Sequence, residues 1–82
     1  MSVEERVIKL ISKAIEIDIN KINDETAIGD FPNWDSMSQL LIITSLEKEF
    51  DIKFDPEDIM ELEDVGDMID AIEGYLNIKT PK

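Results

Sequence analysis

The fold is decided by the stretch WDSMSQLLIITSLEKEF, which occupies residues 34–50. From Ser36 to Phe50 it contains neither Gly nor Pro, and its apolar residues recur at helical spacing, so it predicts one uninterrupted helix. One face of this helix carries Met37, Leu40, Leu41 and Thr44, and the opposite face carries Ile42, Ile43, Leu46 and Phe50. We expect the second face to pack in the core. The first face is either covered, as in a central helix, or exposed as a docking surface.

A first helix is predicted upstream of this stretch. Ser2 and Glu5 form a capping-box pattern, in which a hydroxyl and a carboxylate satisfy free amide groups at a helix start, so the helix begins near Val3. The apolar stripe of this helix consists of Val3, Val7, Leu10, Ile11 and Ala14, and the other side carries Arg6, Lys9 and Lys13.

Residues 18–34 predict a long loop, because they are rich in Asn, Gly and Pro. A loop of this length is unusual in a small domain unless apolar side chains pin it to the core. We expect the pinning side chains to be Ile19, Ile22, Ile28, Phe31 and Trp34.

Two further helices are predicted downstream. Asp55 can cap a short helix that begins at Pro56 and ends near Glu61. Asp64 and Asp67 repeat the capping pattern before an apolar stripe that consists of Val65, Met68, Ile69, Ile72, Tyr75 and Leu76. The predicted fold is therefore all-α, a four-helix bundle with a long loop between helices one and two and a short third helix. We expect residues 1–78 to form the domain and residues 79–82 a flexible C-terminal tail.

Composition excludes several classes of function. A chain of 82 residues builds one modest core, and it contains neither His nor Cys, so the commonest general base, thiol chemistry and Cys- or His-based metal sites are excluded. The net charge of -12 opposes binding to nucleic acid or to an anionic membrane surface. No stretch resembles a signal peptide or a membrane span. We expect a cytoplasmic monomer that is not an enzyme.

The acidic residues are concentrated in the second half of the chain. Between Glu47 and Glu73 there are twelve Asp and Glu residues against Lys48 and Lys53. This region is either a solvated face that keeps the domain soluble or a surface for a basic partner. It lacks the residue spacing of a calcium-binding loop, and we expect no metal site.

Ser36 is the candidate for chemistry, because it lies where the long loop meets the start of the longest helix. The free amides and the positive end of the helix dipole favour a phosphate group at that point, so the position suits a phosphodiester. The alternative is that Asp35 or Ser36 only caps the helix, with Ser36 and Gln39 forming a capping box. Acid chemistry by the Asp35 and Asp30 carboxylates is a further alternative, although the chain provides no pocket for it.

Three motifs resemble the acyl carrier protein family, which also includes peptidyl and aminoacyl carriers. They are Asp35-Ser36-Met37, the helix ending Leu46-Glu47-Lys48-Glu49-Phe50-Asp51-Ile52, and the helix entry Phe54-Asp55-Pro56-Glu57-Asp58-Ile59. The resemblance covers nearly the whole chain. It implies that Ser36 receives a 4'-phosphopantetheine arm from coenzyme A, that Asp35 helps the transferase's divalent metal and positions the coenzyme, and that Met37 contacts the transferase or the arm.

Departures from the fatty-acid type of carrier point to a specialised pathway. Trp34 before Asp35 resembles stand-alone carriers, including D-alanyl carriers, and Ser38 and Leu41 stand where fatty-acid carriers usually have acids. The expected surface for partner docking consists of Leu40, Leu41, Thr44, Lys48 and Asp58.

The resemblance implies a carrier that tethers acyl or aminoacyl groups as a thioester and delivers them to other enzymes. The implied partners are a phosphopantetheinyl transferase, an acyl- or aminoacyl-activating ligase, and acyltransferases or condensing enzymes with basic docking surfaces. The alternative from another class is a small acidic interaction module without a prosthetic group. The cargo and the pathway do not follow from the sequence.

Overall fold

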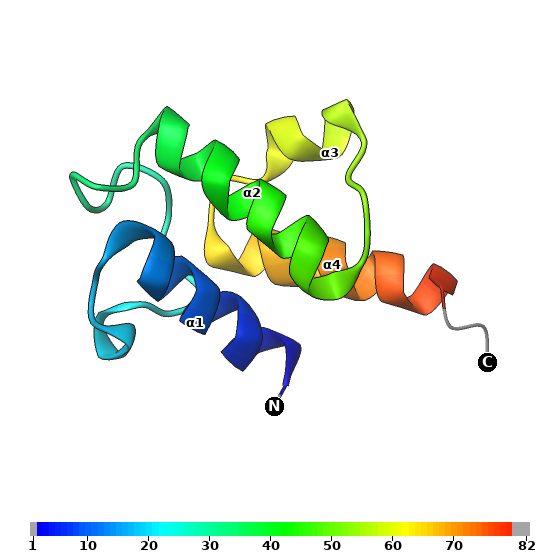
Figure 1. The fold of residues 1–82 in the computed structure, drawn as a ribbon, viewed down its shortest axis with the longest axis horizontal. Helices are drawn as coiled ribbons and strands as arrows, with labels where there is room; N and C mark the ends of the chain where they lie inside the picture. The colour runs from blue at the N-terminus through cyan, green and yellow to red at the C-terminus, as the bar shows by residue number, and fades with distance from the viewer. Residues whose placement is uncertain (1, 80–82) are drawn as a thin grey trace.

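The computed structural model describes residues 2–79, and they form a helical bundle (Figure 1). The elements in chain order are α1 (Val3–Ile15), the 3-10 helix η1 (Ile19–Lys21), α2 (Ser36–Phe50), α3 (Pro56–Glu61) and α4 (Val65–Lys79). Within the described range there is no strand, only an isolated antiparallel bridge between Ala27 and Asp64. The expected all-α fold with a long first loop and a short third helix is confirmed. None of the described helices has the length and apolar character that crossing a bilayer requires.

The helix ends follow local rules in most places. The Ser2 hydroxyl accepts the amide of Glu5, which confirms the serine half of the capping box. The Glu5 carboxylate accepts the Ser2 hydroxyl and no backbone amide of the described residues, so the other half is not formed. Asp55 occupies the cap position before Pro56, as expected, but its side chain makes no capping hydrogen bond. Instead, the Tyr75 hydroxyl on α4 accepts the Asp55 amide at 3.0 Å, so a tertiary contact stabilises the start of α3. At the other end of the chain, α4 continues through Lys79, and the remaining residues of the predicted tail lie outside the described range.

The core is built by α1, α2 and α4, with α1 packed against both of the others. Its buried apolar residues are Val7, Ile11, Ile15, Ile22, Trp34, Ile42, Ile43, Leu46, Phe50, Phe54, Leu62, Val65, Met68 and Ile72. The second face predicted for α2 is thus buried, as expected. None of the residues of α3 is buried, so this helix lies on the periphery of the core.

The long loop is pinned by some of the expected side chains. Trp34 and Ile22 are buried, and Ile28 and Phe31 are half-buried against the core. Ile19 was expected to join them but is 43% exposed, so that prediction is wrong. Ile19 begins the short turn η1, all three residues of which are exposed.

The loop also docks on the connection between α3 and α4 through backbone hydrogen bonds. The amides of Ile28, Val65 and Gly66 donate to carbonyls across this junction at 2.9 Å. A Cβ atom at Gly66 would lie 3.1 Å from the Asp24 carbonyl, so glycine permits the close approach. These bonds hold the loop, and with it the start of α2, against the rest of the bundle.

Candidate functional site

Ser36 is the first residue of α2 and is exposed, at the end of the helix where the long loop arrives (Figure 1). The helix cap is Asp35, whose Oδ1 accepts the amides of Met37 and Ser38 at 3.1 and 3.0 Å. The alternative capping box between Ser36 and Gln39 is therefore wrong. The Gln39 side chain points to other partners, and the Ser36 hydroxyl makes no hydrogen bond to another described residue.

Gln39 has a role that sequence reasoning missed, because the sequence suggested it only as a capping partner of Ser36. Its Oε1 accepts the indole Nε1–H of buried Trp34 at 2.6 Å, and its Nε2 donates to the Leu62 carbonyl beyond α3. One side chain thus joins the loop before the serine, the first turns of α2 and the α3–α4 connection. Sequence periodicity carries no signal for such a link, because it depends on where two distant segments meet.

Two more side chains fix the loop just before the serine. The Ser38 hydroxyl donates to the Asn33 carbonyl at 2.6 Å, and the Asn33 side-chain amide donates to the Ile15 carbonyl at the end of α1 at 3.0 Å. The exposed serine is therefore carried on a backbone that is bonded on both sides. A group attached to it would start from a fixed point on the domain.

The charge at this end of α2 is set by the cap and the helix. The Ser38 amide, which donates to the Asp35 carboxylate, is the main cause that lowers the pKa of Asp35 below its ordinary value of 3.8. The carboxylate is thus ionised at neutral pH. The neighbouring Ser36 hydroxyl is accessible to solvent and free of competing hydrogen bonds with described residues, which fits a phosphodiester linkage there.

The first face predicted for α2 is exposed, so the alternative that it is covered, as in a central helix, is wrong. Met37, Leu40 and Leu41 are 82%, 63% and 53% exposed, and Thr44 is exposed as well. We call these four residues the apolar stripe. Large apolar side chains exposed side by side on a small protein are typical of an interaction surface.

The structure separates the other expected docking residues. Lys48 is exposed on α2, four residues beyond Thr44 and thus in line with the apolar stripe. Asp58, on α3, is half-buried, and its carboxylate accepts the Tyr75 hydroxyl at 2.6 Å. The Asp30 carboxylate, considered as a partner of Asp35 in acid chemistry, accepts the Ala27 amide and closes a turn.

Comparison with known proteins gives the family. A family model described as "Phosphopantetheine attachment site" matches residues 5–72. The acyl carrier protein of Buchnera aphidicola is 35% identical over 81 residues, which cover 99% of this chain and 98% of that protein.

Solved structures agree with the sequence matches. The solution structure of the holo acyl carrier protein from Geobacter metallireducens superimposes with a TM-score of 0.84 at 29% identity, over 96% of this chain and 91% of that one. The acyl carrier protein from Enterococcus faecalis gives a TM-score of 0.72 at 33% identity, over 89% of this chain and 92% of that one.

These matches show a carrier function that uses covalently bound 4'-phosphopantetheine, and they do not favour an interaction module without a prosthetic group. Carriers of this kind work with transferases and biosynthetic enzymes. The chain belongs to the acyl carrier protein family.

Proposed function

We propose that Ser36 is the residue that carries the 4'-phosphopantetheine arm. The supporting observation is its hydroxyl, which is exposed at the positive end of α2 and bonded to no other described residue. Among the other serines, Ser12 and Ser38 donate to backbone carbonyls and Ser2 caps α1, while Ser45 is half-buried within α2, away from the start of the helix. The arm supplies a thiol that holds an acyl or aminoacyl cargo as a thioester.

In this proposal the chain performs no chemistry of its own and acts by position. Asp35 keeps the α2 start in one geometry and places a negative charge beside Ser36, which suits its expected role with the transferase's divalent metal. Met37, one residue further, is highly exposed and so is available to contact the transferase or the arm. The domain raises the concentration of the cargo at each enzyme that docks on it.

The partners we propose are a phosphopantetheinyl transferase, an activating ligase, and acyltransferases or condensing enzymes. The apolar stripe begins beside Ser36 and supports their docking there, while the acidic second half of the chain favours basic partner surfaces. Because Ser38 and Leu41 replace acids that fatty-acid carriers usually have, we place the chain in a specialised pathway. The cytoplasmic location stays a prediction, which fractionation of cells would test.

The test is modification of the apo-protein by coenzyme A, magnesium and a broad-specificity phosphopantetheinyl transferase. We expect intact-mass spectrometry to show one added phosphopantetheine and peptide mapping to place it on Ser36. Ser36→Ala should abolish the addition without changing helicity, whereas the control Ser45→Ala, on the same helix, should be modified normally. Addition at another serine would refute the assignment. So would the absence of any addition, provided that the same transferase preparation modifies a second carrier protein.

A further inference from the structure

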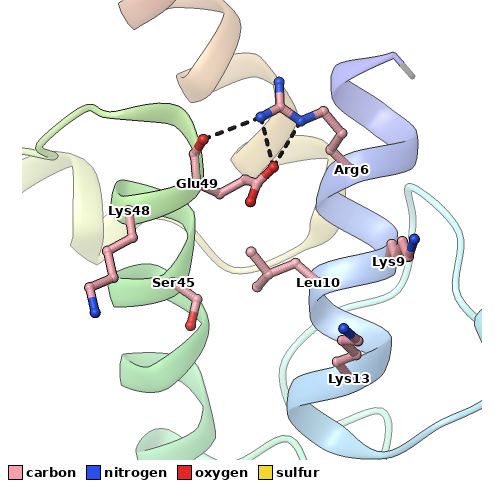
Figure 2. Close-up of a pocket in the computed structure, with 7 residues that line it drawn as sticks. All are labelled: Arg6, Lys9, Leu10, Lys13, Ser45, Lys48 and Glu49. Atoms are coloured by element: carbon pink, nitrogen blue, oxygen red, sulfur yellow. Dashed lines mark hydrogen bonds and ion pairs between the residues drawn. The ribbon is translucent and has the colours of Figure 1, made fainter.

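A groove of about 520 Å³ lies between α1 and α2, and neither Ser36 nor the residues of the apolar stripe line it. It is lined by Arg6, Lys9, Leu10, Lys13, Ser45, Lys48 and Glu49 (Figure 2). Helix α1 supplies the residues of one wall and α2 those of the other, and the half-buried Leu10 lies between the charged side chains.

Arg6 and Glu49 form one end of the groove and neutralise each other. The guanidinium donates to Glu49 Oε2 at 2.7 and 3.0 Å and to the Glu49 carbonyl at 3.2 Å, and it lies 4.3 Å from the centre of the Phe50 ring. This bonding leaves Arg6 fixed in place. The positive charge in the rest of the groove therefore comes from lysines.

The groove is positive in a strongly negative protein. Four of the eight basic residues of the chain line it, and the one acidic residue among its lining residues, Glu49, is already paired. Lys9, Lys13 and Lys48 form no ion pair with another described residue, although the chain has 20 acidic residues. Since no carboxylate of the described residues lies within ion-pair distance of these three lysines, their amines are available to carboxylates from outside.

The arrangement of the positive charges indicates the kind of ligand. The lysine amines do not converge on one point, so they do not form a cage for a single small anion (Figure 2). Arg6, Lys9 and Lys13 are spaced by three and four residues, which makes a ridge about 10 Å long on α1. A ridge of charge beside an apolar side chain is complementary to a segment that carries carboxylates at the same spacing and an apolar residue toward Leu10.

We propose that the groove between α1 and α2 binds an acidic, amphipathic segment of a partner protein. A second copy of this chain is a weaker fit, because two molecules of net charge -12 repel each other. The groove and the apolar stripe meet at Lys48, so one partner can occupy both surfaces. The carrier would then offer two docking surfaces of different chemistry: an apolar one beside the attachment site and a basic one along α1.

The probe for this proposal is a synthetic helical peptide of about three turns with Glu at i, i+3 and i+7 and Leu on the adjoining edge. Titration of the isotope-labelled apo-protein at low salt, followed by NMR, should shift the amide signals around Lys9, Lys13 and Ser45. A peptide of the same composition in scrambled order should bind more weakly. Raising the sodium chloride concentration should weaken binding of the designed peptide, because the contacts are exposed ion pairs.

Charge-neutral variants separate the groove from the net charge of the chain. The double substitution Lys9→Gln and Lys13→Gln should weaken binding roughly fivefold to tenfold. The matched control, Lys21→Gln with Lys53→Gln, changes the net charge equally at exposed lysines outside the groove and should have little effect.

Several outcomes would overturn the proposal. One is an equal loss of peptide affinity in both double variants, and another is equal binding of the scrambled and the designed peptide. A third is that inorganic pyrophosphate alone produces the same signal shifts as the designed peptide. The last is that the chain forms a salt-sensitive dimer that the Lys9→Gln and Lys13→Gln double variant abolishes. The proposal does not depend on the prosthetic group, since the apo-protein is used. Both double variants should still receive phosphopantetheine on Ser36. If the unsubstituted chain were not modified there, the proposed attachment residue would be wrong, but the proposal for the groove would be unaffected.

Discussion

At the scale of single residues, the attachment site depends on neighbours that carry no reactive group. Ser36 itself makes no hydrogen bond to another described side chain, yet its place is held by Asp35, Ser38 and Gln39. Of these, Gln39 has the widest reach, because it bonds both the indole of Trp34 and the carbonyl of Leu62.

Gln39→Leu tests this link while keeping a similar side-chain size. It leaves the Trp34 N–H and the Leu62 carbonyl without their partner, and each unsatisfied buried group costs about 1–3 kcal/mol. We expect chemical denaturation to show a loss of that order. The control Thr44→Val removes an exposed hydroxyl whose partner is the Leu40 carbonyl of the same helix, and it should change stability by less than about 0.5 kcal/mol. Similar losses in the two variants would mean that water replaces the Gln39 bonds.

At the scale of elements, α2 serves two purposes with its two apolar faces. Ile42, Ile43 and Leu46 are buried in the core, whereas Leu40 and Leu41 are exposed in the apolar stripe. The exposed face adds little to folding stability and is available for function.

Leu41→Glu tests the purpose of the exposed face. As a surface change it should lower the free energy of unfolding by less than about 1 kcal/mol, while slowing transfer of cargo to or from a partner enzyme, since a charge is placed in an apolar contact. Leu46→Ala on the opposite face should cost roughly 2–5 kcal/mol. A loss of several kcal/mol for Leu41→Glu would show that the stripe contributes to the fold after all.

Helix α3 depends on Tyr75 in α4 rather than on a core of its own. The Tyr75 hydroxyl accepts the Asp55 amide and donates to the Asp58 carboxylate, and the ring makes an edge-on contact with Phe54 at 5.4 Å. The bond to Asp58 raises the pKa of Tyr75 above its ordinary value of 10.0. The neutral hydroxyl is the bonded form, so this stabilisation is complete below pH 10 and is lost as the pH rises through the pKa of the folded state.

Tyr75→Phe should keep the ring contact and remove both hydrogen bonds. We expect amide hydrogen exchange in residues 56–61 to accelerate more than exchange in α1 or α2, because α3 has no buried residue to hold it. In the unsubstituted protein the same segment should be the first helix to exchange at low salt. Strong protection of residues 56–61 in the variant would show that these bonds do not control α3.

At the scale of the whole molecule, unbalanced charge opposes folding. The acid-rich region between Glu47 and Glu73 contains two lysines, neither of which forms an ion pair with a described residue. Three of the four basic residues that line the groove lie on α1, outside this region, so the repulsion among the acids is largely uncompensated within the domain.

The melting temperature at neutral pH should therefore rise with salt. The Debye length falls from roughly 30 Å at 0.01 M to about 10 Å at 0.1 M, which screens repulsion between exposed carboxylates. Millimolar calcium or magnesium should raise the melting temperature further by bridging neighbouring carboxylates. Calorimetry at matched ionic strength separates the two effects. A melting temperature insensitive to salt and to divalent ions would mean that the acids are spaced widely enough not to repel.

The sequence alone determined the helices, the class of fold and the candidate serine. Local rules predicted three features that depend only on neighbours in the chain. They are the cap at Ser2, the helix from Ser36 to Phe50, which contains neither Gly nor Pro, and the helix start at Pro56. The tertiary structure decided which face of α2 is exposed, that Ile19 faces solvent, that Tyr75 replaces the Asp55 cap, and that Gln39 secures Trp34. It also brought the lysines of α1 and α2 to one groove. The physical reason is that each of these features depends on contacts between segments far apart in the chain, and helical periodicity constrains the faces of one helix without fixing which neighbour covers them.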